Sequence, residues 1–318
     1  MQTKFALQPA SYSLADEFGL ANIPQTHQIA GFADGHPAVP PRKSYVFLPR
    51  KLRDVLAFWE SGLVALKIYG DPGTGKTSIV QQFHARLRWP LYQVSCSPST
   101  EAYQLIGQLL PNADGTLKWV DGPVLSAARE GTSVLLDEYN TMDPGQATGL
   151  NMLLEGYSIV IPETGEVLHP KKGFRVFATE NPIDSRLSVA GRNVQDVAND
   201  ERWMCTDADY LPEEHEIKAV MQALLDDGTP HDVAAMLSEQ VVRTANDVRA
   251  AYRSHNDAIV KPMSTRSAIR WAKLVRRFQN VKADEGGAVI YALRRAYAMN
   301  KDMATAVESY VKARFGSV

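Results

Sequence analysis

Between residues 64 and 210, short runs of apolar residues alternate with segments in which apolar residues recur every three or four positions. The periodic segments predict helices, including one at about 51–60 ahead of the first apolar run. Strands that alternate with helices form a parallel sheet with helices on both faces, joined by right-handed crossovers. We therefore predict an α/β core over residues 46–210. The apolar runs predict its buried strands, at residues 64–69, 91–96, 133–137 and 174–179.

From Leu211 onward, helical periodicity dominates to the end of the chain. Glycine and proline interrupt it near residues 228–230, at Pro262 and at residues 286–287. We therefore predict a C-terminal all-helical domain over residues 211–318. The breaks divide it into predicted helices at residues 213–226, 231–255, 264–279, 287–298 and 302–314.

Two stretches interrupt the α/β pattern. Residues 109–124 contain a turn cluster at 112–115 followed by an apolar run, and residues 158–169 place the turn sequence 163–165 between two apolar runs. Turn residues between short β-prone runs are typical of hairpins. We expect a hairpin insertion in each stretch.

Residues 1–45 show little apolar periodicity and carry Pro24, Pro37, Pro40 and Pro41. Proline fixes φ and removes a backbone donor, so it interrupts helices and strands. We therefore expect an irregular N-terminal arm, in which we find no motif.

The composition narrows the class of protein. The chain has 318 residues, of which 45% are hydrophobic and 22% charged, as in ordinary globular proteins of two domains. The net charge of −2 gives no overall attraction to nucleic acid. Cys96 and Cys205 are too few for a disulfide scaffold and lack metal-site spacing, which suits a reducing cytosol. We expect no signal peptide, no membrane span and a cytoplasmic location.

The sequence from Gly70 to Thr77, GDPGTGKT, matches the phosphate-binding pattern G-x-x-x-x-G-K-[ST]. Glycines in such a loop let several backbone N–H groups point at one anion. Lys76 would reach the β- and γ-phosphates, and the Thr77 hydroxyl would bind Mg²⁺. The apolar run before the loop and the helical spacing of Ile79 and Phe83 after it supply the expected strand and helix. The candidate ATP-binding residues are Gly70, Asp71, Pro72, Gly73, Thr74, Gly75, Lys76, Thr77 and Ser78.

Two further strand ends carry polar side chains. Asp137 and Glu138 follow the apolar run 133–136, and Asn181 follows the run 174–179. The carboxyl ends of parallel strands meet at one edge of a sheet, beside the phosphate loop. Asp137 would hold Mg²⁺, directly or through water, and Glu138 would activate the attacking water. The Asn181 amide would donate to phosphate and accept from water.

Together these residues resemble the AAA+ ATPases over about residues 38–315, and residues 135–140 and 177–182 resemble the MoxR group of that family. The two expected hairpins fall where this group carries its insertions, in helix 2 and before sensor 1. Within the group the chain is similar to the ATPase subunit of aerobic cobaltochelatase. That similarity lies in residues 200–203, 210–213, 45–47 and 89–90.

The resemblance implies roles for two arginines as well as for Glu138 and Asn181. Arg202 matches the arginine finger, which reaches the γ-phosphate bound by the neighbouring subunit. Arg266 matches sensor 2, which contacts phosphate in cis and makes the helical domain a lid. The family often places asparagine at the end of the second strand as a switch for the catalytic glutamate. This chain has Ser95 there, and a hydroxyl would do that job more weakly.

The resemblance implies an ATP-hydrolysing, Mg²⁺-dependent remodelling motor. It would act as a closed ring, by resemblance a hexamer, because an arginine finger needs a neighbour. The implied partner is a protein with a von Willebrand factor A domain. In cobaltochelatase such an assembly inserts a metal into a tetrapyrrole, and other relatives activate metalloenzymes.

Two other functions stay open on the sequence alone. A nucleotide-gated scaffold would bind ATP with little turnover, although Glu138 and Arg202 argue against it. A nucleic-acid motor, such as a clamp loader or helicase, is disfavoured by the near-neutral charge. The sequence identifies neither the client nor the pathway, nor whether a substrate passes through a pore.

Overall fold

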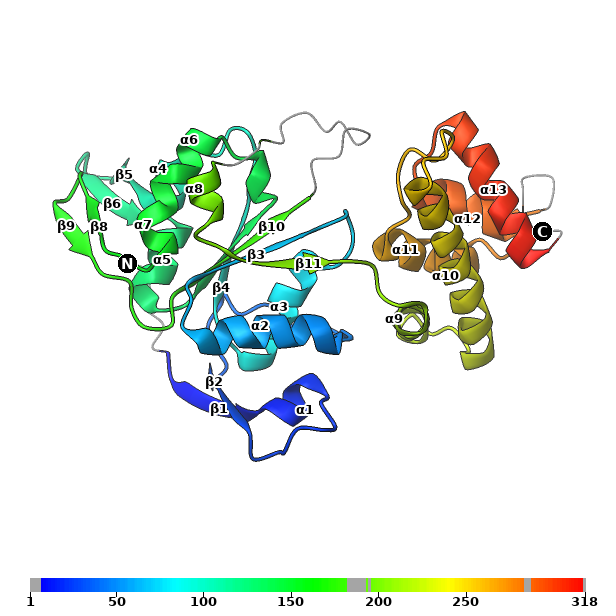
Figure 1. The fold of residues 1–318 in the computed structure, drawn as a ribbon, viewed down its shortest axis with the longest axis horizontal. Coiled ribbons are helices and arrows are strands. Elements are labelled where there is room, and N and C mark those ends of the chain that lie inside the picture. The colour runs from blue at the N-terminus through cyan, green and yellow to red at the C-terminus, as the bar shows by residue number, and fades with distance from the viewer. Residues whose placement is uncertain (1–6, 182–192, 194–195, 283–286, 317–318) are drawn as a thin grey trace.

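The computed structural model describes residues 7–181, 193, 196–282 and 287–316. It shows a sheet covered by helices and, beside it, a group of C-terminal helices (Figure 1). The α/β fold with a helical C-terminal region that the sequence predicts is confirmed.

The central sheet has five strands in the order β11-β3-β10-β7-β4, and every neighbouring pair is parallel. The four predicted strands are present, with ends that differ by at most one residue. The sequence did not indicate β11, because this edge strand contains the polar residues Thr206 and Asp207. The strands are β3 (Ala65–Gly70), β4 (Leu91–Ser95), β7 (Ser133–Asp137), β10 (Arg175–Glu180) and β11 (Met204–Ala208).

Successive side chains of each strand pack on opposite faces of the sheet, as strand geometry requires. Leu135 and Phe177 pack with α2 (Pro49–Ser61) and α3 (Lys76–Leu87) on one face. Val134 and Leu136 pack on the other face, with short helices. Those helices are α5 (Pro123–Glu130), α6 (Pro144–Ala147) and α7 (Asn151–Leu154).

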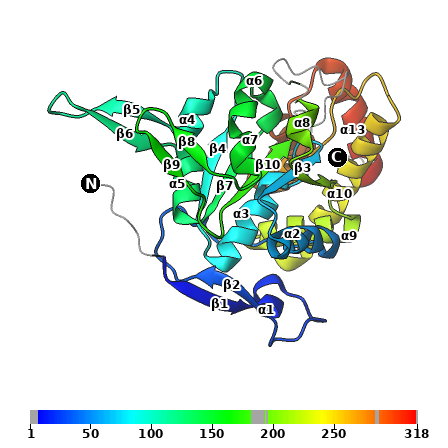
Figure 2. The ribbon, with the colours of Figure 1, turned by 60° about the vertical axis from the view of Figure 1, so that its left-hand side comes forward.

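Two antiparallel strand pairs lie in the stretches for which the sequence indicates hairpins. The pair β5–β6 projects from the body, and β8–β9 lies beside it (Figure 2). Arg129 at the end of α5 bridges them, with its Nε 2.7 Å from Asp121 and its Nη1 2.6 Å from Glu166. The elements are α4 (Ala102–Ile106), β5 (Gly107–Pro111), β6 (Leu117–Asp121), β8 (Ile159–Ile161) and β9 (Glu166–Leu168).

The N-terminal arm is more regular than the sequence predicted. Strands β1 (Pro9–Ser13) and β2 (Gln28–Phe32) pair antiparallel, with helix α1 (Leu14–Phe18) between them. Phe18 is buried, with its ring centroid 5.2 Å from that of Phe83 in α3. The prediction of an irregular arm is therefore wrong for these elements. Each is only five residues long, too short to give a clear period, and the arm is ordered by packing against the core.

The C-terminal helices form a hydrophobic core of their own. Trp271 lies fully buried there, and its indole N–H donates to the Val289 carbonyl at 2.9 Å. Among the residues described, none of the helices has the length and apolar character needed to span a bilayer. The helices α8 (Val197–Asp200), α9 (Glu213–Leu225), α10 (His231–Arg253), α11 (Thr265–Arg277), α12 (Gly287–Ala296) and α13 (Lys301–Phe315) complete the chain.

Candidate nucleotide-binding site

The phosphate loop joins the end of β3 to the start of α3, and glycine is required at three of its positions. Gly73 and Gly75 have φ of 78° and 89°, in the left-handed region. A Cβ on Gly70 would lie 2.0 Å from the Ala208 carbonyl oxygen. The Thr74 hydroxyl donates to the Asp71 carbonyl at 2.8 Å and tightens the turn. The first N–H groups of α3 therefore face this loop, where they favour an anion.

Lys76 is buried, and its ammonium group connects the loop to Asn181. Its Nζ donates to the carbonyls of Gly70 and Asp71 at 2.7 and 2.9 Å, and to Asn181 Oδ1 at 2.9 Å. The structure thus brings together a cation and an amide that lie more than a hundred residues apart.

Thr77 and Asp137 meet at the next strand end. The Thr77 hydroxyl donates to Asp137 Oδ1 at 2.8 Å, and the Thr179 hydroxyl donates to the same oxygen. A hydroxyl and a carboxylate this close fit Mg²⁺, which binds few protein oxygens and completes its shell with water and phosphate. In the described part of the chain no group of three or more His, Cys, Asp or Glu side chains could hold a metal ion.

Glu138 directly follows Asp137 and turns the chain away from the sheet. Its φ of 56° is unusual for a residue with a side chain and costs on the order of 1 kcal/mol. Two hydrogen bonds hold this conformation: the Glu138 N–H donates to the Thr179 hydroxyl at 3.1 Å, and the Thr141 hydroxyl donates to the Glu138 carbonyl at 2.8 Å. The side chain is exposed, and its carboxylate has no hydrogen-bond partner among the described residues.

The end of β4 lies beside these two acids. Ser95 is the ladder partner of Asp137, but no hydrogen bond joins its hydroxyl to Glu138 within the residues described. The next residue, Cys96, is buried. Burial, together with the Asp137 and Glu138 carboxylates, raises the pKa of the Cys96 thiol to about 12. The thiol therefore stays neutral, so it is a poor nucleophile, and it packs as an apolar side chain in the core.

The two arginines lie in different places. Arg266, near the start of α11, is exposed and lines the same cavity as the phosphate loop. The Ser264 cap of this helix touches the loop, since a Cβ on Gly73 would lie 2.2 Å from Ser264 Cβ. Arg202 instead follows α8, where it pairs with Glu155 at 2.5 Å and donates to the Ala198 carbonyl.

A cavity of about 570 Å³ continues from the phosphate loop toward the helical region. This volume is in the range of small-ligand pockets. Its walls include residues 43–46, the loop residues 73–75 with Ser78, and residues of the C-terminal region, among them Leu211, Arg266 and several residues of α9. In the sequence, residues 45–47 contributed only to the similarity with the cobaltochelatase ATPase subunit, and no function was predicted for them. Burial raises the pKa of Tyr45, so its hydroxyl stays protonated.

Sequence reasoning also missed a charged cluster next to Asn181. Lys67 is buried in β3, with its Nζ 2.5 Å from Asp200 Oδ1 and 3.6 Å from Glu180 Oε1. Burial raises the pKa of Glu180, and the Lys67 charge opposes that shift. The cluster joins the strand end that carries Asn181 to the helix that precedes Arg202. A lysine inside an otherwise apolar strand was the signal available in the sequence.

Comparison with known proteins agrees with this geometry. Residues 65–197 match the family described as "AAA domain (dynein-related subfamily)", and residues 219–314 match "CbbQ/NirQ/NorQ C-terminal". The denitrification regulatory protein NirQ of Stutzerimonas stutzeri is 32% identical over 219 residues, which cover 69% of this chain and 74% of NirQ.

Two further relatives match over different extents. The aerobic cobaltochelatase subunit CobS of Sinorhizobium sp is 27% identical over 229 residues, which cover 67% of this chain and 66% of CobS. Midasin of Dictyostelium discoideum is 37% identical over 123 residues, which cover 37% of this chain but 2% of midasin. The chain therefore belongs to the MoxR-type AAA+ ATPases, with a CbbQ/NirQ/NorQ C-terminal domain and with NirQ and CobS as relatives.

Proposed function

We propose that this chain is a Mg²⁺-dependent ATPase that works as a ring-forming remodelling motor on a protein partner. The convergence of three strand ends on the phosphate loop carries the proposal. Lys76 contacts Asn181 at 2.9 Å, and Thr77 contacts Asp137 at 2.8 Å. Hydrolysis needs a phosphate-binding group, a metal ligand and a water-activating group in one place. We assign the first to the phosphate loop with Lys76, the second to Thr77 and Asp137, and the third to the neighbouring Glu138.

Each residue has a defined task in this proposal. The loop N–H groups and Lys76 bind the triphosphate, and Asn181 orients the γ-phosphate or the attacking water. Glu138 accepts the proton of that water. Thr77 and Asp137 would hold Mg²⁺, which when bound neutralises charge on the phosphates.

The helical region, residues 211–318, is proposed to act as a lid over the α/β core, residues 46–210. Arg266 would contact the phosphates in cis, so nucleotide release would change the position of the lid. Arg202 would act on the nucleotide of the neighbouring subunit, which requires a closed ring, proposed to be a hexamer.

The relatives suggest the kind of work that the ring does. One is named a denitrification regulatory protein and another an aerobic cobaltochelatase subunit. We place this chain with them, in the cytoplasm, as a motor that acts through a von Willebrand factor A partner to insert a metal or activate a metalloenzyme. Such a partner would be retained on Glu138→Gln protein in ATP and lost in ADP.

The direct test is Glu138→Gln. An amide cannot take the proton, so this variant should bind ATP as the wild type does while phosphate release falls by about a hundredfold or more. Equilibrium binding of a fluorescent ATP and a phosphate-release assay measure the two effects. Glu163→Gln, at the exposed turn between β8 and β9, is the matched control and should be unchanged. Near-normal turnover in Glu138→Gln would remove Glu138 as the base, and a wild type without turnover would favour a nucleotide-gated scaffold.

A further inference from the structure

One wall of the nucleotide cavity has no regular structure of its own. Residues 43–46 line the cavity, yet the chain from residue 41 to residue 48 is neither helix nor strand. An irregular segment fixes a ligand only if its backbone is held by contacts from outside. The side chains that hold this segment therefore affect how firmly a ligand in the cavity is bound.

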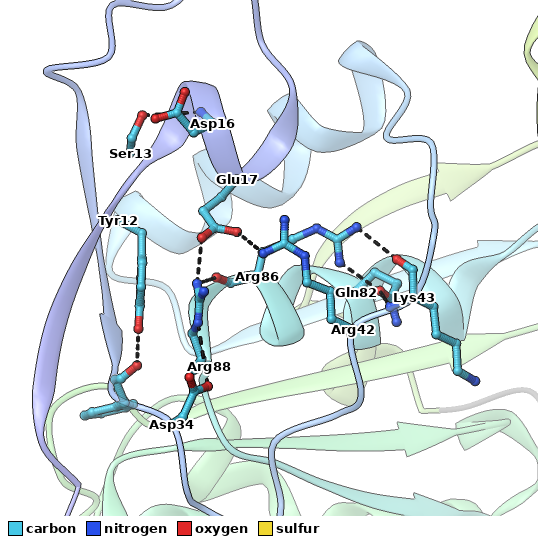
Figure 3. A network of polar contacts seen from close by, with 11 residues as sticks. Tyr12, Ser13, Asp16, Glu17, Asp34, Arg42, Lys43, Gln82, Arg86 and Arg88 are labelled. Carbon is cyan, nitrogen blue, oxygen red and sulfur yellow. Dashed lines mark hydrogen bonds and ion pairs between the residues drawn. The ribbon is translucent and has the colours of Figure 1, made fainter.

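Two buried side chains of α3 hold the backbone of the wall. Gln82 Oε1 accepts the Lys43 N–H at 2.8 Å, and its Nε2 donates to the Pro41 carbonyl at 3.1 Å. Arg86 Nη2 donates to the Lys43 carbonyl at 3.0 Å, and its Nη1 donates to Gln82 Oε1 at 2.9 Å. Figure 3 shows both side chains reaching from the helix to this segment. The same helix begins at Lys76, so it holds the phosphate loop and this wall at a fixed separation.

The N-terminal arm braces the segment from outside. Glu17 in α1 accepts from Arg42 Nη1 at 2.7 Å and from Arg88 Nη1 at 2.6 Å (Figure 3). Arg42 lies between the two residues whose backbone Gln82 holds. The Glu17 and Arg88 side chains are only 13% and 23% exposed, so solvent screens this ion pair less than it screens surface pairs, whereas Arg42 is 52% exposed. The arm is thereby connected to the cavity wall.

We propose that Gln82 and Arg86, braced by Glu17, are positioning residues that set the affinity of the site for the nucleoside part of its ligand. The inference rests on the proposed function, because it assumes that a nucleoside triphosphate fills the cavity. The inference predicts that the affinities for two ligands respond differently. Loss of this support weakens binding of ATP, which needs the wall, but leaves inorganic tripolyphosphate unaffected, because that ligand needs only the phosphate loop.

The test compares Gln82→Met and Glu17→Ala with the wild type in the full chain. Gln82→Met keeps the size of the side chain but removes three hydrogen bonds, so the Kd and KM for ATP should rise about tenfold. Glu17→Ala removes an outer brace and should raise both about threefold. For both variants the kcat and the Kd for tripolyphosphate should stay within about twofold of the wild type.

Asp34→Asn is the matched control. Asp34 is an arm acid 3.7 Å from Arg88, but it is 88% exposed and does not contact Arg42. It should leave both ligands unaffected. An unchanged ATP affinity in Gln82→Met and Glu17→Ala would overturn the inference, and so would equal weakening of ATP and tripolyphosphate.

If Gln82→Met did not fold, as judged by thermal unfolding, Glu17→Ala would decide alone, because Glu17 lies in the short helix α1 of the arm, outside the α/β core. A wild type that bound neither ATP nor tripolyphosphate would instead show that the proposed function is wrong, and this inference would fall with it.

Discussion

The Lys76 ammonium group contacts both the phosphate loop and Asn181. It is held by the Gly70 and Asp71 carbonyls and by Asn181 Oδ1. A bound triphosphate would offer negatively charged oxygens in place of neutral carbonyls, which adds the attraction between opposite charges to the hydrogen bonds of the ammonium group. The lysine is thus already placed where the ligand arrives. Asn181 would detect its movement directly, because the two side chains touch.

Replacing Lys76 by alanine should therefore abolish nucleotide binding. The loop loses its phosphate cation, and we expect the Kd for ATP to rise by about a hundredfold or more. Isothermal titration calorimetry measures the change, with Lys172→Ala, an exposed lysine before β10, as control. ATP affinity equal to that of the wild type would refute the role of Lys76.

At the scale of elements, one tyrosine connects the phosphate loop to the helical region. Tyr210 lies between β11 and α9, and its hydroxyl donates to the Pro72 carbonyl at 3.0 Å. Its ring packs on the Arg249 guanidinium, 4.0 Å from the ring centroid. Arg249 is in turn held by Glu216, with oxygens at 2.6 and 2.7 Å. In the proposed lid mechanism, a movement of α9 or α10 would reach the loop through these contacts.

Tyr210→Phe removes only the hydroxyl of this connection. The hydrogen bond is worth about 1 kcal/mol, so we expect the KM for ATP to rise about fivefold. The melting temperature should fall by no more than about 2–4 °C, because only the hydrogen bond is lost and the ring still packs on Arg249. Steady-state kinetics and calorimetry give the two values, and Tyr157→Phe, an exposed tyrosine, is the control. A lower melting temperature with an unchanged KM would mean that Tyr210 serves stability alone.

Individual elements differ in how well the sequence predicts them. The strand containing Val134, Leu135 and Leu136 is buried on both faces, so it is a continuous apolar run that is readily identified. Strand β11 lies at the edge and alternates with polar residues, which leaves no such run. At the site, the position of Asp137 beside the phosphate loop follows from the rule that the carboxyl ends of parallel strands meet at one edge of a sheet. The cavity wall at Tyr45 depends on contacts between distant segments, which no local pattern reports.

At the scale of the whole molecule, the position of Arg202 determines how the site is completed. Arg202 follows α8, whose Asp200 contacts Lys67 in β3, beside β10, the strand that precedes Asn181. Its partners among the described residues are Glu155 and the Ala198 carbonyl, neither of which belongs to the phosphate loop. In the proposed ring, an arginine at this place would act on the phosphate bound by another subunit. The proposed ring therefore makes a prediction about mixtures of variants.

Arg202→Ala should bind ATP normally but lose hydrolysis, as Glu138→Gln does. Mixing the two inactive proteins should restore activity if the arginine acts in trans. An Arg202→Ala subunit with an intact Glu138 then gains an arginine from its Glu138→Gln neighbour. In a random equal mixture about a quarter of the interfaces would be complete, and phosphate release should recover to about that fraction of the wild type. If Arg202 acted within its own subunit, no mixture would recover, and normal hydrolysis by Arg202→Ala alone would exclude any role for it.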